Sequence, residues 1–292
     1  MSAWRRAPFL ALGAAAILGL ASPRRADGQG VIVAPPVVVI DHRTRGGSLE
    51  LYNSSRTPVE VAIALEYGYP VTDSLGAIGL ATFDTAAPGE PTAAPWIDIY
   101  PKRVTVPPGQ RQTVRFLARP PADLADREYW SRIIISSKLG AIPVTTADTT
   151  SGISASLNLT VNTITTLLYR KGMMQTSLAI SGLTTTVTPD SLTVRTMMTP
   201  SGNAAWLGTI RGSLENAQGS VVAGFERPIG IYHPIDPAFT LSRAGVPPGT
   251  YTLVLEGQTD RADLPRSSLV QAPTVRAQIE VTIATVAAPS RP

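Results

Sequence analysis

The sequence contains no cysteine. This absence excludes disulfide bonds, thiol chemistry and a lipid anchor on an N-terminal cysteine, so core packing alone must hold the chain together. There are only two histidines, His42 and His233, and they fall in different halves of the chain. A catalytic triad would need one of them beside a nucleophile and a carboxylate.

The motifs of common enzymes and metal proteins are also missing. No GxSxG elbow, HExxH helix, phosphate-binding GxxxxGK(S/T) loop or EF-hand spacing occurs. His233 and Asp236 could supply half of a metal site, but no further ligands cluster with them, and His-Pro followed by Asp-Pro is typical of turns. We therefore expect no enzymatic activity, no metal and no cofactor.

Long hydrophobic runs are confined to the N-terminus. The apolar stretch 7–21 follows two arginines, and it is too short for a membrane-spanning helix, which needs about 20 apolar residues. These features predict a cleavable signal peptide over residues 1–28, with cleavage after Gly28 or Ala21. The sequence thus predicts an exported protein without membrane insertion, located in the periplasm or secreted.

No large excess of charge of one sign remains once that segment is set aside. Removing residues 1–28 lowers Lys+Arg from 25 to 21 and Asp+Glu from 21 to 20, which leaves a net charge of +1. The net charge of +4 of the full chain therefore belongs largely to the signal peptide. Charge gives no support to a nucleic-acid partner or to an anionic membrane.

What the chain has in abundance is alternation of apolar and polar residues. In PVEVAIALEY, the side chains from Val59 to Tyr67 at every second position share one face of a strand, and glutamates and alanines share the other. With 26 prolines and 24 glycines, this pattern indicates many short strands joined by turns. The other predicted strands cover residues 48–53, 95–100, 112–118, 127–137, 153–169, 176–181, 190–196, 206–216, 220–225, 250–257 and 274–283.

These strands fall into two clusters, because YRKGMMQ interrupts the alternation near Lys171 and Gly172. We predict an all-β protein with two immunoglobulin-like β-sandwich domains in tandem after the signal peptide. The first domain is expected over residues 31–171 and the second over 172–285, followed by a disordered tail at 286–292.

The motif VPPG occurs twice, from Val106 and from Val246, each time ahead of an alternating run. Three predicted strands follow the first copy within its cluster and two follow the second, so the motif is a reused turn and not a repeated domain. Proline presets φ for such a turn, and we expect Gly109 and Gly249 to supply a residue with φ > 0. Tyr251 is either the tyrosine-corner residue of a sandwich or a core tyrosine.

The run PWIDIYPKRVTVPPGQRQTVRFLARPPADLADREYWSRIIISS resembles the N-terminal immunoglobulin-like domain of the periplasmic pilus-assembly chaperones of the chaperone-usher family. SLELYNSS (48–55) resembles the second strand of that domain, and LNLTVNTITTLLYRK (157–171) resembles its last strand. The resemblance covers residues 31–171. The features that carry it in the first run are Trp96-Ile97, Pro101, Pro108-Gly109, Gln112 with Val114-Arg115, Pro121 with Leu124, and Arg127-Glu128.

The resemblance implies a non-enzymatic periplasmic chaperone. Such chaperones bind unassembled β-rich pilus or surface subunits, which lack a final strand, and an outer-membrane usher is a further partner. The last strand of the chaperone is lent to the client, with its alternate side chains in the client's groove. Leu157, Leu159 and Val161 match the donor positions; alternatively, they pack into their own core.

The family also holds the client's C-terminal carboxylate with two cations, an arginine on the first strand and a lysine on the last. The lysine position is here Thr166, and the first strand has no arginine near Pro36 and Val37. The stretch 41–45 is either a solvated turn or an anion-binding segment. The cations that could replace the family's pair are Arg170, Lys171, Arg43 and Arg45.

A second interpretation is a structural or adhesive pair of immunoglobulin-like modules in a cell-envelope or extracellular assembly. The missing cations favour it, whereas the ordered motifs of the first domain oppose it. The second half of the chain shows no motif beyond its sandwich pattern. Fast amide exchange along one side of residues 155–163 would indicate a strand free to donate, and slow exchange on both sides would favour the structural module.

Overall fold

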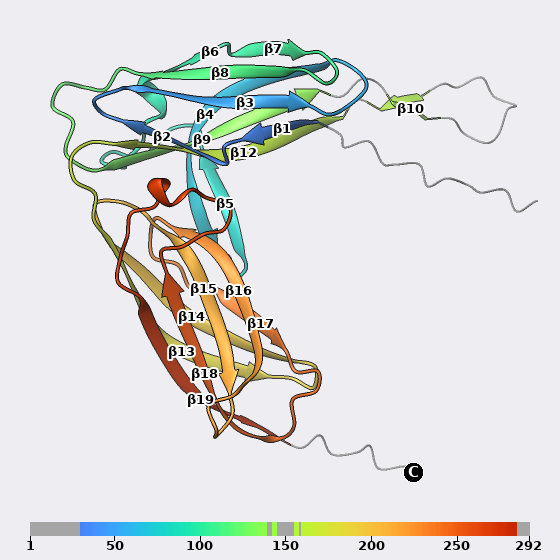
Figure 1. The fold of residues 1–292 in the computed structure, drawn as a ribbon, viewed down its shortest axis with the longest axis vertical. Helices are drawn as coiled ribbons and strands as arrows, with labels where there is room; N and C mark the ends of the chain where they lie inside the picture. Colours follow the sequence, from blue (N-terminus) through green and yellow to red (C-terminus); the bar gives the residue numbers. More distant parts are fainter. Residues whose placement is uncertain (1–29, 139–141, 145–154, 158, 285–292) are drawn as a thin grey trace, which may run out of the picture.

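The computed structural model describes residues 30–138, 142–144, 155–157 and 159–284 (Figure 1). The predicted signal peptide (1–28) and the predicted tail (286–292) lie outside these residues. The architecture consists of strands, with two short 3₁₀ segments, η1 (Ala94–Trp96) and η2 (Arg266–Ser268). In the part of the chain described, no helix has the length and apolarity to cross a membrane.

The first domain is a sandwich of two sheets. One sheet has the strand order β1 (Val31–Ala34), β3 (Gly46–Asn53), β8 (Arg111–Ala118) and β6 (Ile97–Tyr100). The other has the order β2 (Val37–Asp41), β12 (Thr160–Arg170), β9 (Glu128–Lys138), β4 (Val59–Thr72) and β5 (Ile78–Phe83), and β7 (Arg103–Val106) pairs with β4. A short hairpin of β10 (Ile142–Val144) and β11 (Ala155–Leu157) lies between β9 and β12 in the chain.

The second domain is also a sandwich. Its first sheet has the order β13 (Thr176–Val187), β14 (Ser191–Gly202) and β17 (Ala238–Ser242). Its second has the order β16 (Val221–Ile231), β15 (Trp206–Glu215), β18 (Gly249–Gln258) and β19 (Val275–Ile283). The prediction of an all-β protein with two sandwiches is thereby confirmed.

Each sandwich has its own core, and the alternation of the strands supplies it. In the first core, inward residues of facing strands meet, among them Leu49 and Leu51 of β3 and Ile133 and Ile135 of β9. In the second, the fully buried Trp206 is the largest residue. Because inward residues are apolar and many of their neighbours polar, the inner face of each sheet is buried. Near the joint, β9 and β15 are buried on both faces.

Strand β4 changes its partner strand halfway along its length. It pairs with β9 as far as Glu66, and from Tyr67 onward it pairs with β5. Tyr67, predicted on the core face with Val59, therefore packs in a third cluster between the domains. Tyr67 is buried, as predicted (4% exposed), but it packs outside the first core, where β4 changes its partner strand.

The two VPPG turns differ in their glycines. Gly109 has φ 67° and fulfils the prediction, but Gly249 does not have a positive φ, and Gly245 takes that role with φ 78°. Gly249 instead begins strand β18. The Tyr251 hydroxyl donates to the carbonyl oxygen of Pro247 at 2.7 Å, and the ring is part of the second core, so both interpretations of this residue hold.

The domains meet in an elbow, and strand β5 extends from the first sandwich along the second (Figure 1). The joint contains an apolar cluster that includes Trp130 and Leu168 of the first domain and Leu207 and Tyr232 of the second. Polar contacts surround it. The buried carboxylate of Glu128 accepts from the amide N–H of Ala205 at 3.1 Å across the joint.

Candidate functional site: the open edge of strand β12

Strand β12 has a partner along its whole length on one side only. Strand β9 pairs with it antiparallel from Thr160 to Arg170, whereas β2 pairs with it in parallel only from Thr166 to Arg170. On the β2 side, no strand of the described residues pairs with residues 160–165. This half of β12 is an open sheet edge, which is a template for another strand.

The backbone hydrogen bonds show which groups point to the open edge. The N–H of Thr166 points toward the carbonyl oxygen of Pro36, at 3.5 Å, on the β2 side. Because the backbone groups of successive residues in a strand point to opposite sides, those of Ile164, Asn162 and Thr160 also point that way. The N–H and C=O groups of these three residues are therefore available to a partner strand.

Apolar side chains stand beside these free groups. Leu159 is 36% exposed and Ile164 is 43% exposed. Val161 is half-buried, and neither Val161 nor Leu159 belongs to the first core, which β12 enters only further along, with Leu167 and Tyr169. The interpretation that Leu159 and Val161 merely fill their own core is not supported by this packing.

Leu157 lies in a different strand from the one predicted. The sequence predicted one continuous strand over residues 153–169, but the strand is interrupted before Thr160, and Leu157 ends β11. There its backbone pairs with Ile142 of β10. The three predicted donor residues thus do not share one strand: Leu157 ends β11, Leu159 lies just before β12, and Val161 lies in β12. Alternation continues across an interruption in pairing and does not reveal it. The side chain of Leu157 lies outside the described part of the structure.

A cation missed by sequence reasoning adjoins Thr166. Arg132 of β9 is the cross-strand partner of Thr166, and its Nη1 donates to the threonine hydroxyl. Its Nε donates to the carbonyl oxygen of Gly68 at 3.0 Å, and the guanidinium lies 4.7 Å from the ring centroid of Tyr232. The residue is 5% exposed, and its Nη2 is buried without a hydrogen-bond partner.

Arg170, a predicted cleft cation, has partners at the domain joint. Its Nε pairs with the Glu128 carboxylate at 2.8 Å, and its Nη2 donates to the carbonyl oxygen of Ser268 at 2.8 Å. Burial raises the pKa of Glu128, and the neighbouring Arg170 charge opposes that rise. Arg170 thus binds the second domain to the first.

The other three predicted cations also have partners. Lys171 donates to the carbonyl oxygen of Leu124 and lies 3.5 Å from an Asp126 carboxylate oxygen. Arg43 pairs with Asp41 at 3.3 Å, and Arg45 donates to the carbonyl oxygen of His42 at 3.3 Å. Segment 41–45 is a hydrogen-bonded turn.

His233 and Asp236 do not converge on a common point. The His233 ring packs 4.3 Å from that of Tyr69, and its Nε2 lies 3.4 Å from a Glu90 carboxylate oxygen. Asp236 instead pairs with Arg195 at 2.6 Å. Within the ranges described, no three His, Cys, Asp or Glu side chains form a group able to hold a metal ion.

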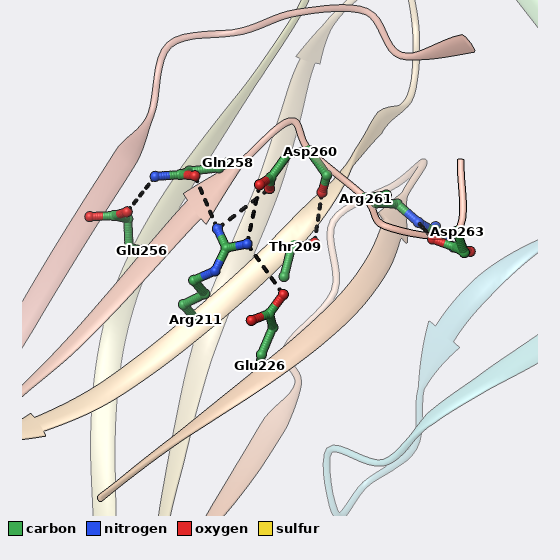
Figure 2. Close-up of polar contacts among 8 residues, drawn as sticks. All are labelled: Thr209, Arg211, Glu226, Glu256, Gln258, Asp260, Arg261 and Asp263. Carbon is green, nitrogen blue, oxygen red and sulfur yellow. Dashed lines mark hydrogen bonds and ion pairs between the residues drawn. The ribbon is translucent and has the colours of Figure 1, made fainter. Parts of the chain in front are cut away.

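The outer face of the second domain carries a polar cluster centred on Arg211 (Figure 2). Its guanidinium donates to Gln258 at 3.0 Å, to Asp260 at 3.1 Å and to Glu226 at 3.2 Å. Gln258 in turn donates to Glu256 at 2.6 Å. The cluster connects β15 with β16 and β18, and its groups bind one another, which fits a structural role.

Comparisons with known proteins find similarity in structure only. No family model matches the chain, and no curated protein matches its sequence. Among solved structures, the YadV chaperone is 13% identical with a TM-score of 0.43, and the match covers 86% of this chain and 99% of that one. The CsuC-CsuE chaperone-tip adhesion subunit pre-assembly complex from archaic chaperone-usher Csu pili of Acinetobacter baumannii matches at 10% identity and TM-score 0.43, covering 85% and 97%. The Salmonella enterica SafA pilin in complex with the SafB chaperone matches at 15% and 0.38, covering 87% and 96%.

Proposed function

We propose that this chain is a non-enzymatic periplasmic chaperone that binds unassembled β-rich pilus or surface subunits through the open edge of β12. The observation that carries the proposal is the backbone of residues 160–165, which no strand pairs with on the β2 side, beside the exposed Leu159. The ordered motifs over residues 31–171 support it independently, because they resemble those of pilus-assembly chaperones.

The mechanism is addition of a strand. A client strand pairs with the free N–H and C=O groups of Thr160, Asn162 and Ile164, and Leu159 and Val161 enter the client's groove. Main-chain hydrogen bonds supply affinity in this mode, and the alternate side chains supply specificity. Full burial of one leucine side chain contributes about 1.5–3 kcal/mol, and Leu159 is only partly buried in the free chain.

Arg132 is the cation that we assign to the client's terminal carboxylate. A buried guanidinium nitrogen without a partner is unfavourable, and a carboxylate would satisfy it with a charge-assisted hydrogen bond. Its place beside Thr166 supports this role, since the resemblance expects a cation at the position of Thr166. The four cations considered from the sequence already have partners.

The test is recovery of a client. The tagged chain is expressed with its own signal in its native periplasm, isolated gently, and its partners are identified by mass spectrometry. We expect a small β-rich subunit in near one-to-one amount with wild type and with Val222→Asp, a control of similar exposure on β16 (38% against 36% for Leu159). Leu159→Asp is expected to lose it.

Two outcomes would overturn the proposal. One is a Leu159→Asp variant that folds normally and recovers the same subunit in the same amount. The other is wild-type protein recovered as a clean monomer or only inside a large envelope complex, which would favour the structural or adhesive module.

A further inference from the structure

Strand β5 has an open edge of its own. It pairs only with β4, and no strand within the described ranges pairs with its other side. Its sequence IGLATF has no charge and no proline, and Ile78, Leu80 and Phe83 are 38%, 42% and 39% exposed. Soluble proteins normally protect such edges with charges, prolines or bulges, so an unprotected one indicates a surface that a partner covers.

The backbone of β5 offers alternate hydrogen-bonding groups to that side. The N–H of Asp73 donates to the carbonyl oxygen of Ala77 at 3.0 Å, which places the backbone of Ala77 on the β4 side. By alternation, the N–H and C=O groups of Ile78, Leu80 and Thr82 point to the open edge. An extended polypeptide is the ligand that such a row recognises.

A groove adjoins β5 where the hairpin of β4 and β5 meets the second domain. It has a volume of about 540 Å³, and its lining is mixed, with the apolar side chains of Pro70, Ile78, Ile229 and Phe239 beside polar groups. A groove of this size is large enough to accept side chains of a bound segment.

The charge of the groove is positive. Arg227 and Arg261 line it, and none of the lining residues is acidic. Arg261 is neutralised by Asp263, at 2.5 Å. Arg227 is exposed, and it has no ion pair among the residues described. A partner's carboxylate would complement it.

The surface is already fixed in place. The Thr72 hydroxyl donates to Asp236 at 2.8 Å, Arg195 donates to the carbonyl oxygen of Ser74 at 2.9 Å, and the N–H of Ala238 donates to Gly76 at 2.9 Å. These bonds hold the hairpin against the second domain. A ligand therefore meets a preorganised edge and groove, which lowers the entropic cost of binding.

We propose that β5 and this groove form a second docking surface, for an extended segment of a partner protein that alternates apolar side chains and carries one carboxylate. The segment pairs with Ile78, Leu80 and Thr82, places an apolar side chain in the groove, and sets its carboxylate against Arg227. Because β5 and β12 are separated by β9 and β4 in the sheet order, a segment on β5 leaves the open edge of β12 free. The proposal does not rest on client binding at β12.

A labelled heptapeptide is the probe, Thr-Val-Thr-Val-Glu-Val-Thr with both ends blocked, titrated with the mature protein and followed by fluorescence anisotropy. We expect Leu80→Lys to weaken binding roughly tenfold or more, because it places a charge on the pairing edge. The matched control is Met197→Lys, at an equally exposed position on β14 of the second domain (42% for both side chains), and it is expected to leave binding unchanged.

The carboxylate is tested with an analogue in which glutamine replaces glutamate. We expect Arg227→Gln to weaken the glutamate peptide by roughly two- to fivefold and to leave the analogue unaffected, as for an exposed ion pair. Thr82→Lys repeats the edge test if Leu80→Lys does not fold. The proposal is overturned if wild type does not bind the peptide, if Met197→Lys abolishes binding while Leu80→Lys does not, or if Arg227→Gln affects both peptides equally.

Discussion

The guanidinium of Arg132 donates a hydrogen bond to the hydroxyl of Thr166 across the pair of strands β9 and β12. Thr166 stands where the resemblance to pilus chaperones expects a lysine. A positive charge is thus present directly across from the Thr166 position, on the neighbouring strand β9 and not on β12. Its burial against Tyr232 also makes it part of the contact between the domains.

Replacing Arg132 should distinguish the contribution of its charge to client binding from the contribution of its packing to stability. We expect Arg132→Gln to reduce recovery of the client subunit strongly and Arg132→Lys to retain part of it, because lysine keeps the charge but loses the planar, multidentate guanidinium. Client recovery is measured beside urea unfolding of each free variant. Equal recovery for both variants at equal stability would show that the charge does not contact the client.

Amide exchange should alternate along the first half of β12. The N–H groups of Asn162 and Ile164 point to the open edge, whereas those of Val161 and Thr163 point to their β9 partners Ser137 and Ile135. In the free protein we expect the first pair to exchange at least roughly a hundredfold faster than the second. Uniformly slow exchange, measured by NMR, would show that the edge is covered.

The ion pair between Arg170 and Glu128 should be costly to break. The Glu128 side chain is 0% exposed and that of Arg170 is 13% exposed, so Arg170→Met leaves a buried carboxylate without its cation. We expect the free energy of unfolding to fall by about 3–5 kcal/mol. The double variant with Glu128→Gln should recover most of that loss. A single variant as stable as wild type would contradict this account of the joint.

Acid should weaken the attachment of the β5 hairpin. The hydrogen bond from Thr72 and the neighbouring Arg195 lower the pKa of Asp236 below its ordinary value of 3.8. The stability that Asp236 adds is therefore fully present above that value, and it is lost as pH falls through the lower folded-state pKa. Asp236→Asn should reduce stability at neutral pH and converge with wild type in strong acid. A difference that is independent of pH in chemical unfolding would refute this.

Much of the fold follows from local pattern. Alternation located the long strands β8, β9, β15 and β18, because each has a continuous partner and an apolar face toward the core of its sandwich. It missed β5, which is mostly exposed and lacks an apolar period, and β7 and β17, whose alternating runs are too short to stand out. The bend of β4 at Tyr67 depends on a change of partner strand, which no local period records.

The candidate site could also be predicted from the sequence only in part. The sequence predicted Leu159 and Val161 as donor residues, since they continue the alternation of a strand that resembles a known one. Arg132 stands as a lone cation between Trp130 and Ile134, and this polar residue in an apolar run was a signal. Its meaning depends on the register that sets it opposite Thr166, and register between distant strands is fixed by tertiary packing.

The measurement that tests the central claim most directly compares amide exchange of β12 with and without the co-purified subunit. If the client adds its strand to the open edge, the amides of Thr160, Asn162 and Ile164 will exchange fast in the free chain and become protected in the complex, while those of Val161 and Thr163 will stay protected throughout. Protection at the first three amides that does not change on binding would contradict strand donation, even if the subunit remains bound.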